Sequence, residues 1–212
     1  MIETIGKGLA LGLFLSIAVG PVLFSIIKQS INNGLKGGLS FVAGVSLSDV
    51  SLVIASNFFT ELFASLNDRR EEIGIIGSTF LISVGIYYIF FKKVKVNEQG
   101  LQELMKFRKR DYAKIFLGGY LMNTLNPAII IFWITTSTAF IDHSFNAKVF
   151  IFSIALCFVL ASDITKVVLA GKLRKKLTVK TISMLNRING MILIGFGIAL
   201  IAGILFYKPD AA

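Results

Sequence analysis

The chain has 212 residues, of which 55% are hydrophobic and only 16% are charged, and its mean hydropathy is +0.77. A soluble domain needs a larger polar share to cover its surface, so this composition excludes a soluble protein and indicates an integral membrane protein. The formal net charge of +10 lies almost entirely between apolar segments, which argues against nucleic acid as a partner.

Six apolar segments follow one another along the chain. Each is long enough to cross about 30 Å of hydrocarbon at about 1.5 Å per residue. The first continues past signal-peptide length without an Ala-x-Ala type cleavage site, so we interpret it as a retained helix. The sequence predicts an all-α integral membrane protein with six transmembrane helices in a single transmembrane domain, residues 1–212. The segments span about 5–27, 39–62, 73–91, 115–140, 146–170 and 186–207.

Lysine and arginine residues are concentrated on one side of the predicted membrane. Of the 22, sixteen fall on the side of the first, third and fifth connections, five fall on the other side, and Lys166 lies inside a segment. Lys28 and Lys36 are counted with the first connection. Because basic loops stay on the cytoplasmic face, this bias predicts a cytoplasmic loop at 92–114 and both termini outside. The basic loops are expected to contact anionic lipid headgroups.

The order of features in the first three segments recurs in the last three. Asp49 follows Pro21 by 28 residues, and Asp163 follows Pro127 by 36. Each half, at about 1–91 and 115–212, holds three segments, so the two halves are predicted to enter the membrane in opposite directions. Inverted repeats of this kind are typical of secondary transporters. A coincidence is the alternative, because the spacings differ and prolines are common in membrane helices.

Gly20-Pro21 and Asn126-Pro127 are predicted to break the first and fourth helices. Proline lacks a backbone N–H and clashes with the preceding turn, so the carbonyls of Ile17 and Asn123 are expected to lose their helical partners. Broken helices near the membrane midplane line cavities, where freed carbonyls bind cations and half-helix N-termini bind anions. A kink without any ligand is the alternative at either position.

Asp49 is the most informative single residue. A carboxylate within the membrane is costly and must face the bundle interior, a partner or water. Such a group is suited to exchange protons during transport, whereas a hydrogen-bonded structural aspartate is the alternative. At 100° per residue it shares one face of the second helix with Ser46, Ser56, Asn57 and Thr60.

Asp163 and Lys166 are three residues apart and therefore share a face of the fifth helix. Two interpretations stay open: an internal salt bridge, or a lysine that extends to the headgroups and leaves Asp163 free to act. Trp133 in the fourth segment is interpreted as a packing or interfacial residue rather than a substrate contact.

Several of these motifs together resemble the signature of the LysE/RhtB family of amino-acid exporters. Two positions depart from it, since the family usually has Gly in place of Ser48 and often Lys in place of Ala128. The resemblance implies export of amino acids or related small solutes, driven by an ion gradient and without a nucleotide-binding domain. The matching positions are Gly20-Pro21, Gly34-x3-Gly38-Leu39, Gly44, Ser48-Asp49, Gly118 and Asn126-Pro127 with Phe132 behind it.

The predicted function is proton-coupled antiport that exports an amino acid or related small solute across the bacterial inner membrane, without a cofactor. The solute is expected between the two broken helices, with its carboxylate near the half-helix N-termini and its ammonium near Asp49. The predicted site residues are Gly20, Pro21, Ser46, Asp49, Asn123, Asn126, Pro127, Asp163 and Lys166.

Other functional classes have less support in the sequence. Export of divalent metal ions, known in the same superfamily, would require clustered ligands, but the only histidine is His143 in a predicted outer loop. An electron carrier needs a pair of redox cysteines, and the chain has only Cys157. An enzyme is not expected, because no HExxH, Walker or nucleophile-base motif is present. The transported solute, the coupling ion and the oligomeric state, a homodimer included, are left open.

Overall fold

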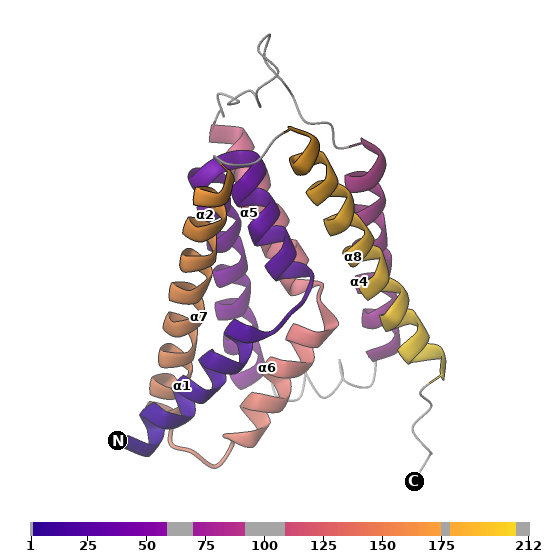
Figure 1. The fold of residues 1–212 in the computed structure, drawn as a ribbon. Helices are drawn as coiled ribbons and strands as arrows, with labels where there is room; N and C mark the ends of the chain where they lie inside the picture. Colours follow the sequence, from indigo (N-terminus) through magenta and orange to yellow (C-terminus); the bar gives the residue numbers. More distant parts are fainter. Residues whose placement is uncertain (1, 59–69, 92–108, 175–178, 207–212) are drawn as a thin grey trace.

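The computed structural model describes residues 2–58, 70–91, 109–174 and 179–206, and these are almost entirely helical, with no strand among them (Figure 1). The prediction of an all-α protein is confirmed. The elements are α1 (Ile2–Ile17), α2 (Pro21–Phe58), α4 (Arg70–Ile86), the π-helical segment η1 (Tyr87–Phe91), α5 (Lys109–Thr124), α6 (Pro127–Ala139), α7 (Phe145–Arg174) and α8 (Val179–Phe206).

Four helices are individually long and apolar enough to cross a membrane, at 21–57, 74–91, 145–172 and 186–206. The pair α5 and α6 passes the same test together, with a bend of 62° between them, which gives a fifth candidate. Large apolar side chains point outward from these helices, among them Phe90, Leu169 and Leu205, which are 60% or more exposed. Such a surface requires lipid as its solvent, so the protein is a multi-pass membrane protein.

The helix α2 folds back on itself at Gly34. This glycine has φ 71° and ψ −174°, a conformation that side-chain-bearing residues rarely adopt. Ile26 and Val45 belong to the same buried core and line the same cavity, although a straight helix would separate them by about 28 Å. The two halves of α2, at 21–33 and 35–58, are therefore packed against each other.

Three predicted connections, the first, third and fifth, differ from the structure. The connection expected between the first two segments is helical on both sides of Gly34, and it buries Lys28 instead of exposing it as a loop residue. The helix α5 begins at Lys109, inside the predicted loop 92–114, and α7 and α8 extend beyond the apolar limits of 170 and 186. Hydropathy marks only the part of a helix in hydrocarbon, whereas basic helix ends continue into the headgroups. Residues 92–108 and Thr60 lie outside the described residues.

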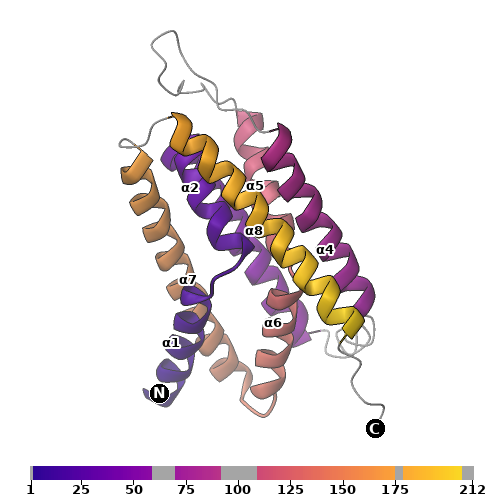
Figure 2. The same cartoon turned by 45° about the vertical axis from the view of Figure 1, so that its right-hand side comes forward.

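The helices α2 and α5 make close backbone contacts with each other. A Cβ atom at Gly44 of α2 would collide with the carbonyl oxygen of Phe116, and one at Gly119 of α5 would collide with that of Phe41. Small residues of this kind let helix backbones approach closely in membranes. Figure 2 shows α8 crossing α2 with α4 alongside it, and α1 packs against α7. The contact between α2 and α5 positions Asp49 opposite Asn123.

Candidate functional site

Two helix interruptions lie near the centre of the bundle. The first separates the end of α1 at Ile17 from Pro21, and the second separates the end of α5 at Thr124 from Pro127. Each proline is the first residue of a new helix, a position where its missing N–H costs nothing because that donor would have no helical partner. The prolines thus start half-helices rather than bending continuous ones.

The second interruption is closed by its own polar groups. Asn126, in an extended conformation, accepts a hydrogen bond on Oδ1 from the backbone N–H of Ala128 at 3.1 Å, so it caps α6. Its own N–H donates to the carbonyl oxygen of Asn123 at 3.1 Å. Pro127 thus removes the usual helical donor to this carbonyl, as expected, but the turn before the proline supplies a new donor, so the carbonyl is not left unbonded.

The first interruption lacks such a cap. Gly20 has no side chain that could accept from the first N–H groups of α2, although its carbonyl oxygen accepts from the N–H of Phe24 at 3.4 Å. Val22 and Leu23 lie in that first helical turn, where backbone N–H groups have no helical acceptor. A Cβ atom placed on Gly20 would meet nothing within 4 Å, so this half-helix N-terminus faces open space.

Asp49 is held by two neutral donors. Asn123 Nδ2 donates to its Oδ1 at 2.8 Å, and Trp133 Nε1 donates to the same oxygen at 3.0 Å. Its Oδ2 has no hydrogen-bond donor among the residues that the structure describes. The side chain is only 4% exposed, and no cation contacts it in the same part of the chain. Because no ion pair in the described residues occupies this carboxyl group, it is available to a ligand or a proton.

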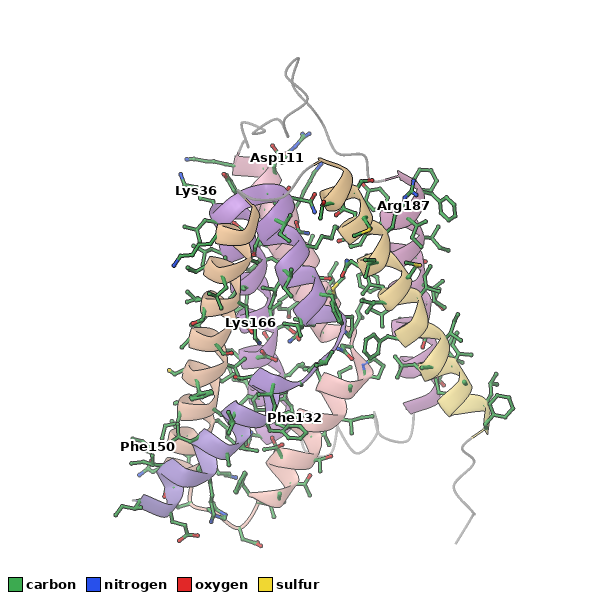
Figure 3. All side chains as sticks on the ribbon, viewed as in Figure 1. Lys36, Asp111, Phe132, Phe150, Lys166 and Arg187 are labelled. Atoms are coloured by element: carbon green, nitrogen blue, oxygen red, sulfur yellow. The ribbon has the colours of Figure 1, made fainter. Side chains whose placement is uncertain are left out.

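Asp163 has a charged partner instead. Its Oδ1 accepts from Lys166 Nζ at 2.8 Å, one turn further along α7. Asp163 is 5% exposed, and Figure 3 places Lys166 at mid-height of the bundle. The lysine thus pairs with Asp163 in this structure rather than extending to the headgroups.

One cavity of about 170 Å³ connects the two interruptions with both aspartates. Its volume is below the about 300–1,000 Å³ of pockets for drug-sized ligands, so it suits a small solute. Ser46 and Pro127 do not line it: Ser46 is half-buried elsewhere on α2, and Pro127 faces the position of Gly77. The predicted site residues that do line it are Gly20, Pro21, Asp49, Asn123, Asn126, Asp163 and Lys166.

Sequence reasoning missed the role of Trp133. The residue is fully buried and donates to Asp49, so the interpretation as mere packing or interface is incomplete. A buried indole N–H usually finds a hydrogen-bond acceptor, and Asp49 is such an acceptor within the membrane. This need for a partner is the signal in the sequence that could have linked Trp133 to Asp49. Asn123 was named for its carbonyl, yet its side-chain amide makes the contact.

A helical membrane bundle whose central, largely apolar cavity holds a few charged and amide side chains at two helix interruptions is the arrangement of a transporter for small molecules. Residues 13–203 match the LysE type translocator family, and the chain belongs to this family. The resemblance found in the sequence is thereby confirmed.

Two relatives from Bacillus subtilis (strain 168) cover most of the chain. The "Uncharacterized membrane protein YrhP" is 29% identical over 175 residues, which is 78% of each chain. The "Putative amino acid efflux protein YcgF" is 26% identical over 198 residues, which is 89% of this chain and 90% of the relative. No solved structure matches the chain.

Proposed function

We propose that this protein exports amino acids or closely related small solutes across the bacterial inner membrane in exchange for protons. The observation that carries the proposal is the Asp49 carboxylate, buried on a central cavity and held only by the neutral donors Asn123 and Trp133. The relative YcgF, named "Putative amino acid efflux protein", supports the same substrate class.

The proposed membrane arrangement has six crossings in two inverted halves. The first half consists of α1 with residues 21–33, then 35–58, then α4 with η1, and the second consists of α5 with α6, then α7, then α8. Each half opens with a broken crossing, which supports the inverted repeat. Lys36 and Arg187 lie at one end of the bundle, here named the basic end, and Phe150 lies towards the other (Figure 3). We assign the basic end to the cytoplasm.

This orientation can be tested by cysteine labelling. Asp142, between α6 and α7, and Lys172, near the end of α7, are both exposed and lie in regions assigned to opposite sides. In a Cys157→Ser background, an impermeant thiol reagent should label Asp142→Cys in intact cells and label Lys172→Cys only after the membrane is permeabilised. Labelling of Lys172→Cys in intact cells would reverse the orientation.

The charges in the cavity match a zwitterion. Asp49, Asp163 and Lys166 sum to −1 when all three are ionised, and this charge suits the ammonium group of an amino acid. The uncapped first turn of α2, with Val22 and Leu23 on the cavity wall, offers N–H groups and a positive helix end to the carboxylate. Both ends of the solute would then be matched across one cavity.

Coupling follows if the proton and the solute ammonium compete for Asp49. An ionised Asp49 binds the ammonium from the cytoplasm, and a proton arriving from outside neutralises the carboxylate and displaces the solute. The protonated carrier returns, and the proton leaves on the cytoplasmic side. One proton moves in for each solute that moves out, so the proton gradient drives export.

The decisive experiment measures transport by the purified protein in liposomes. Labelled amino acids should show counterflow, and an imposed pH gradient should drive their accumulation. An uncoupler that collapses the gradient should abolish accumulation and spare counterflow, while divalent metal ions assayed in parallel should not move. Transport of metal ions without any amino acid would remove the proposal, and amino-acid accumulation indifferent to the uncoupler would remove its proton coupling.

A further inference from the structure

A second polar cluster lies away from the Asp49 cavity, between α2, η1 and α8. Lys28 of α2 is only 4% exposed, and its Nζ lies 2.6 Å from the ring centroid of Tyr88 in η1. The face of an aromatic ring attracts a cation. Burial of an ammonium group is costly, and π-helical segments such as η1 are frequent at functional sites.

Three asparagine side chains surround the same junction. Asn32, one turn beyond Lys28, exchanges two hydrogen bonds with Asn186 of α8, at 2.7 and 3.3 Å. Asn189 lies one turn further along α8 and is 4% exposed. Neither its Nδ2 nor its Oδ1 has a hydrogen-bond partner among the described residues. Buried amides are rarely left without any partner, so the side chain of Asn189 has hydrogen-bonding capacity that a polar ligand or a water molecule could use.

The cluster and the Asp49 cavity lie along the same seam of the bundle. At 100° per residue, Asn186, Asn189, Leu193 and Phe196 share one face of α8, and Figure 2 shows this helix crossing α2. Phe196 lines the Asp49 cavity, whereas Asn186 and Asn189 lie further along the helix. A solute that follows this face towards the basic end leaves one polar region and reaches the other.

An apolar layer separates the two regions. Leu193 is fully buried in one core cluster together with Ile26, Leu81 and Tyr88. Ile26 and Leu81 also line the Asp49 cavity, while Tyr88 carries Lys28 on its ring. The same apolar cluster therefore contacts both the Asp49 cavity and Lys28, and it could separate the two regions as a closed gate.

We propose that Lys28, Asn186 and Asn189 form a loading site that binds the carboxylate of the solute before it reaches Asp49, with Ile26, Leu81 and Leu193 as the gate between them. The ammonium of Lys28 and the amide N–H groups are donors suited to a carboxylate, and Asn189 Oδ1 accepts from the solute ammonium. This inference rests on the proposed amino-acid transport, and it adds a second, one-sided site to it.

The test compares an amino acid with its carboxamide analogue, which lacks the negative charge. Half-saturating concentrations for both are measured in membrane vesicles of each orientation, so that the solute is offered from one side at a time. The variants are Lys28→Met, which keeps the length of the side chain, Lys28→Arg, which keeps the charge, and Asn189→Leu, which keeps the shape. Lys36→Met, an exposed lysine on the same helix, is the matched control.

The wild-type protein should prefer the acid over the amide by about tenfold or more from the side of the basic end, as expected for charge-assisted hydrogen bonds. Lys28→Met should reduce this preference towards one from that side only, Asn189→Leu should reduce it partly, and Lys28→Arg and Lys36→Met should preserve it. A purely structural cluster would instead change both solutes equally.

Two outcomes separate this inference from the proposed function. A wild-type protein that transports amino acids, with an acid preference unchanged in Lys28→Met or reduced equally from both sides, overturns the loading site and leaves the exporter intact. A wild-type protein that transports no amino acid overturns both. Should Lys28→Met fail to fold, Asn189→Leu is decisive: an acid preference that is undiminished from the basic end overturns the inference.

Discussion

Asp49 and Asp163 each follow a helix interruption in the chain, at Pro21 and Pro127, yet their surroundings differ. Both are almost fully buried and line the same cavity. Asp49 accepts hydrogen bonds from two neutral side chains, whereas Asp163 forms an ion pair with Lys166. When all three groups are ionised, Asp49 adds a charge of −1 to the cavity, whereas Asp163 and Lys166 together add none. Two buried aspartates on one cavity thus differ, because one has only neutral donors and the other is paired with a cation.

The two helix interruptions also differ, because only one of them has a side-chain cap. Asn126 caps the half-helix of the second half, while Gly20 leaves the half-helix of the first half without a side-chain cap. The start of α2 therefore has no side-chain cap, whereas the cap of α6 and the Asp163–Lys166 pair are satisfied within the protein. Two interruptions on one cavity thus differ in the polar groups that they leave available.

The largest expected effect follows from Asp49→Asn. Asparagine keeps the shape and some hydrogen bonding of aspartate but cannot change charge, so pH-driven accumulation should fall by roughly a hundredfold or more while the protein still inserts and folds. Gradient-independent counterflow survives only if the carboxylate serves the proton alone. The liposome assay checks both, with Asp142→Asn, an exposed aspartate, as the control. Full pH-driven transport in Asp49→Asn would place the coupling group elsewhere.

The second largest effect concerns the Asp163–Lys166 pair, where stability and transport can be measured separately. Asp163→Asn leaves the Lys166 ammonium without its carboxylate and should lower the free energy of unfolding by about 3 kcal/mol. The double variant Asp163→Asn with Lys166→Met removes both charges and should recover most of the lost stability. It should also transport in response to a pH gradient, as the wild-type protein does. Thermal unfolding in detergent and the liposome assay measure the two quantities. If the double variant folds normally but has lost pH-driven transport, Asp163 takes part in coupling and the comparison fails.

A smaller effect is expected when one donor to Asp49 is removed. Trp133→Phe retains most of the aromatic packing but loses the N–H bond, so Asp49 is positioned by Asn123 alone. The half-saturating solute concentration should rise by about three- to tenfold, the usual range for one hydrogen bond to a charged group. Phe150→Leu, on the exposed face of α7, is the control. An unchanged half-saturating concentration would show that the indole serves packing only.

The smallest effect on stability comes from giving the first interruption the cap of the second. Gly20→Asn has room for its side chain, which can accept from the first turn of α2 and should stabilise the fold by about 0.5–1 kcal/mol at most. The same cap competes with the solute carboxylate, so the half-saturating concentration should rise. The melting temperature and transport kinetics are measured together. A Gly20→Asn protein with wild-type kinetics would show that the solute does not use this helix end.

Much of the fold was predictable because hydropathy and helix breaking are local properties. Within the described residues the apolar runs are helical, as predicted, and Pro21 and Pro127 mark the two interruptions. Lys28 is a counterexample, since a lysine between two apolar segments looks like a loop residue. The reversal at Gly34 and the contact with the ring of Tyr88, which the sequence does not reveal, accompany its burial.

The sequence by itself determined that the protein crosses a membrane, where its two helix interruptions lie, and that a buried aspartate needs a partner. Only the tertiary structure decided which partner each aspartate has. Asn123 and Trp133 lie 74 and 84 residues from Asp49, so their contact depends on how α2, α5 and α6 pack. Lys166 lies three residues from Asp163, so the sequence could suggest that pair but left it open whether the lysine turns inward. A side chain's direction depends on what surrounds its helix, and that is a property of the whole bundle.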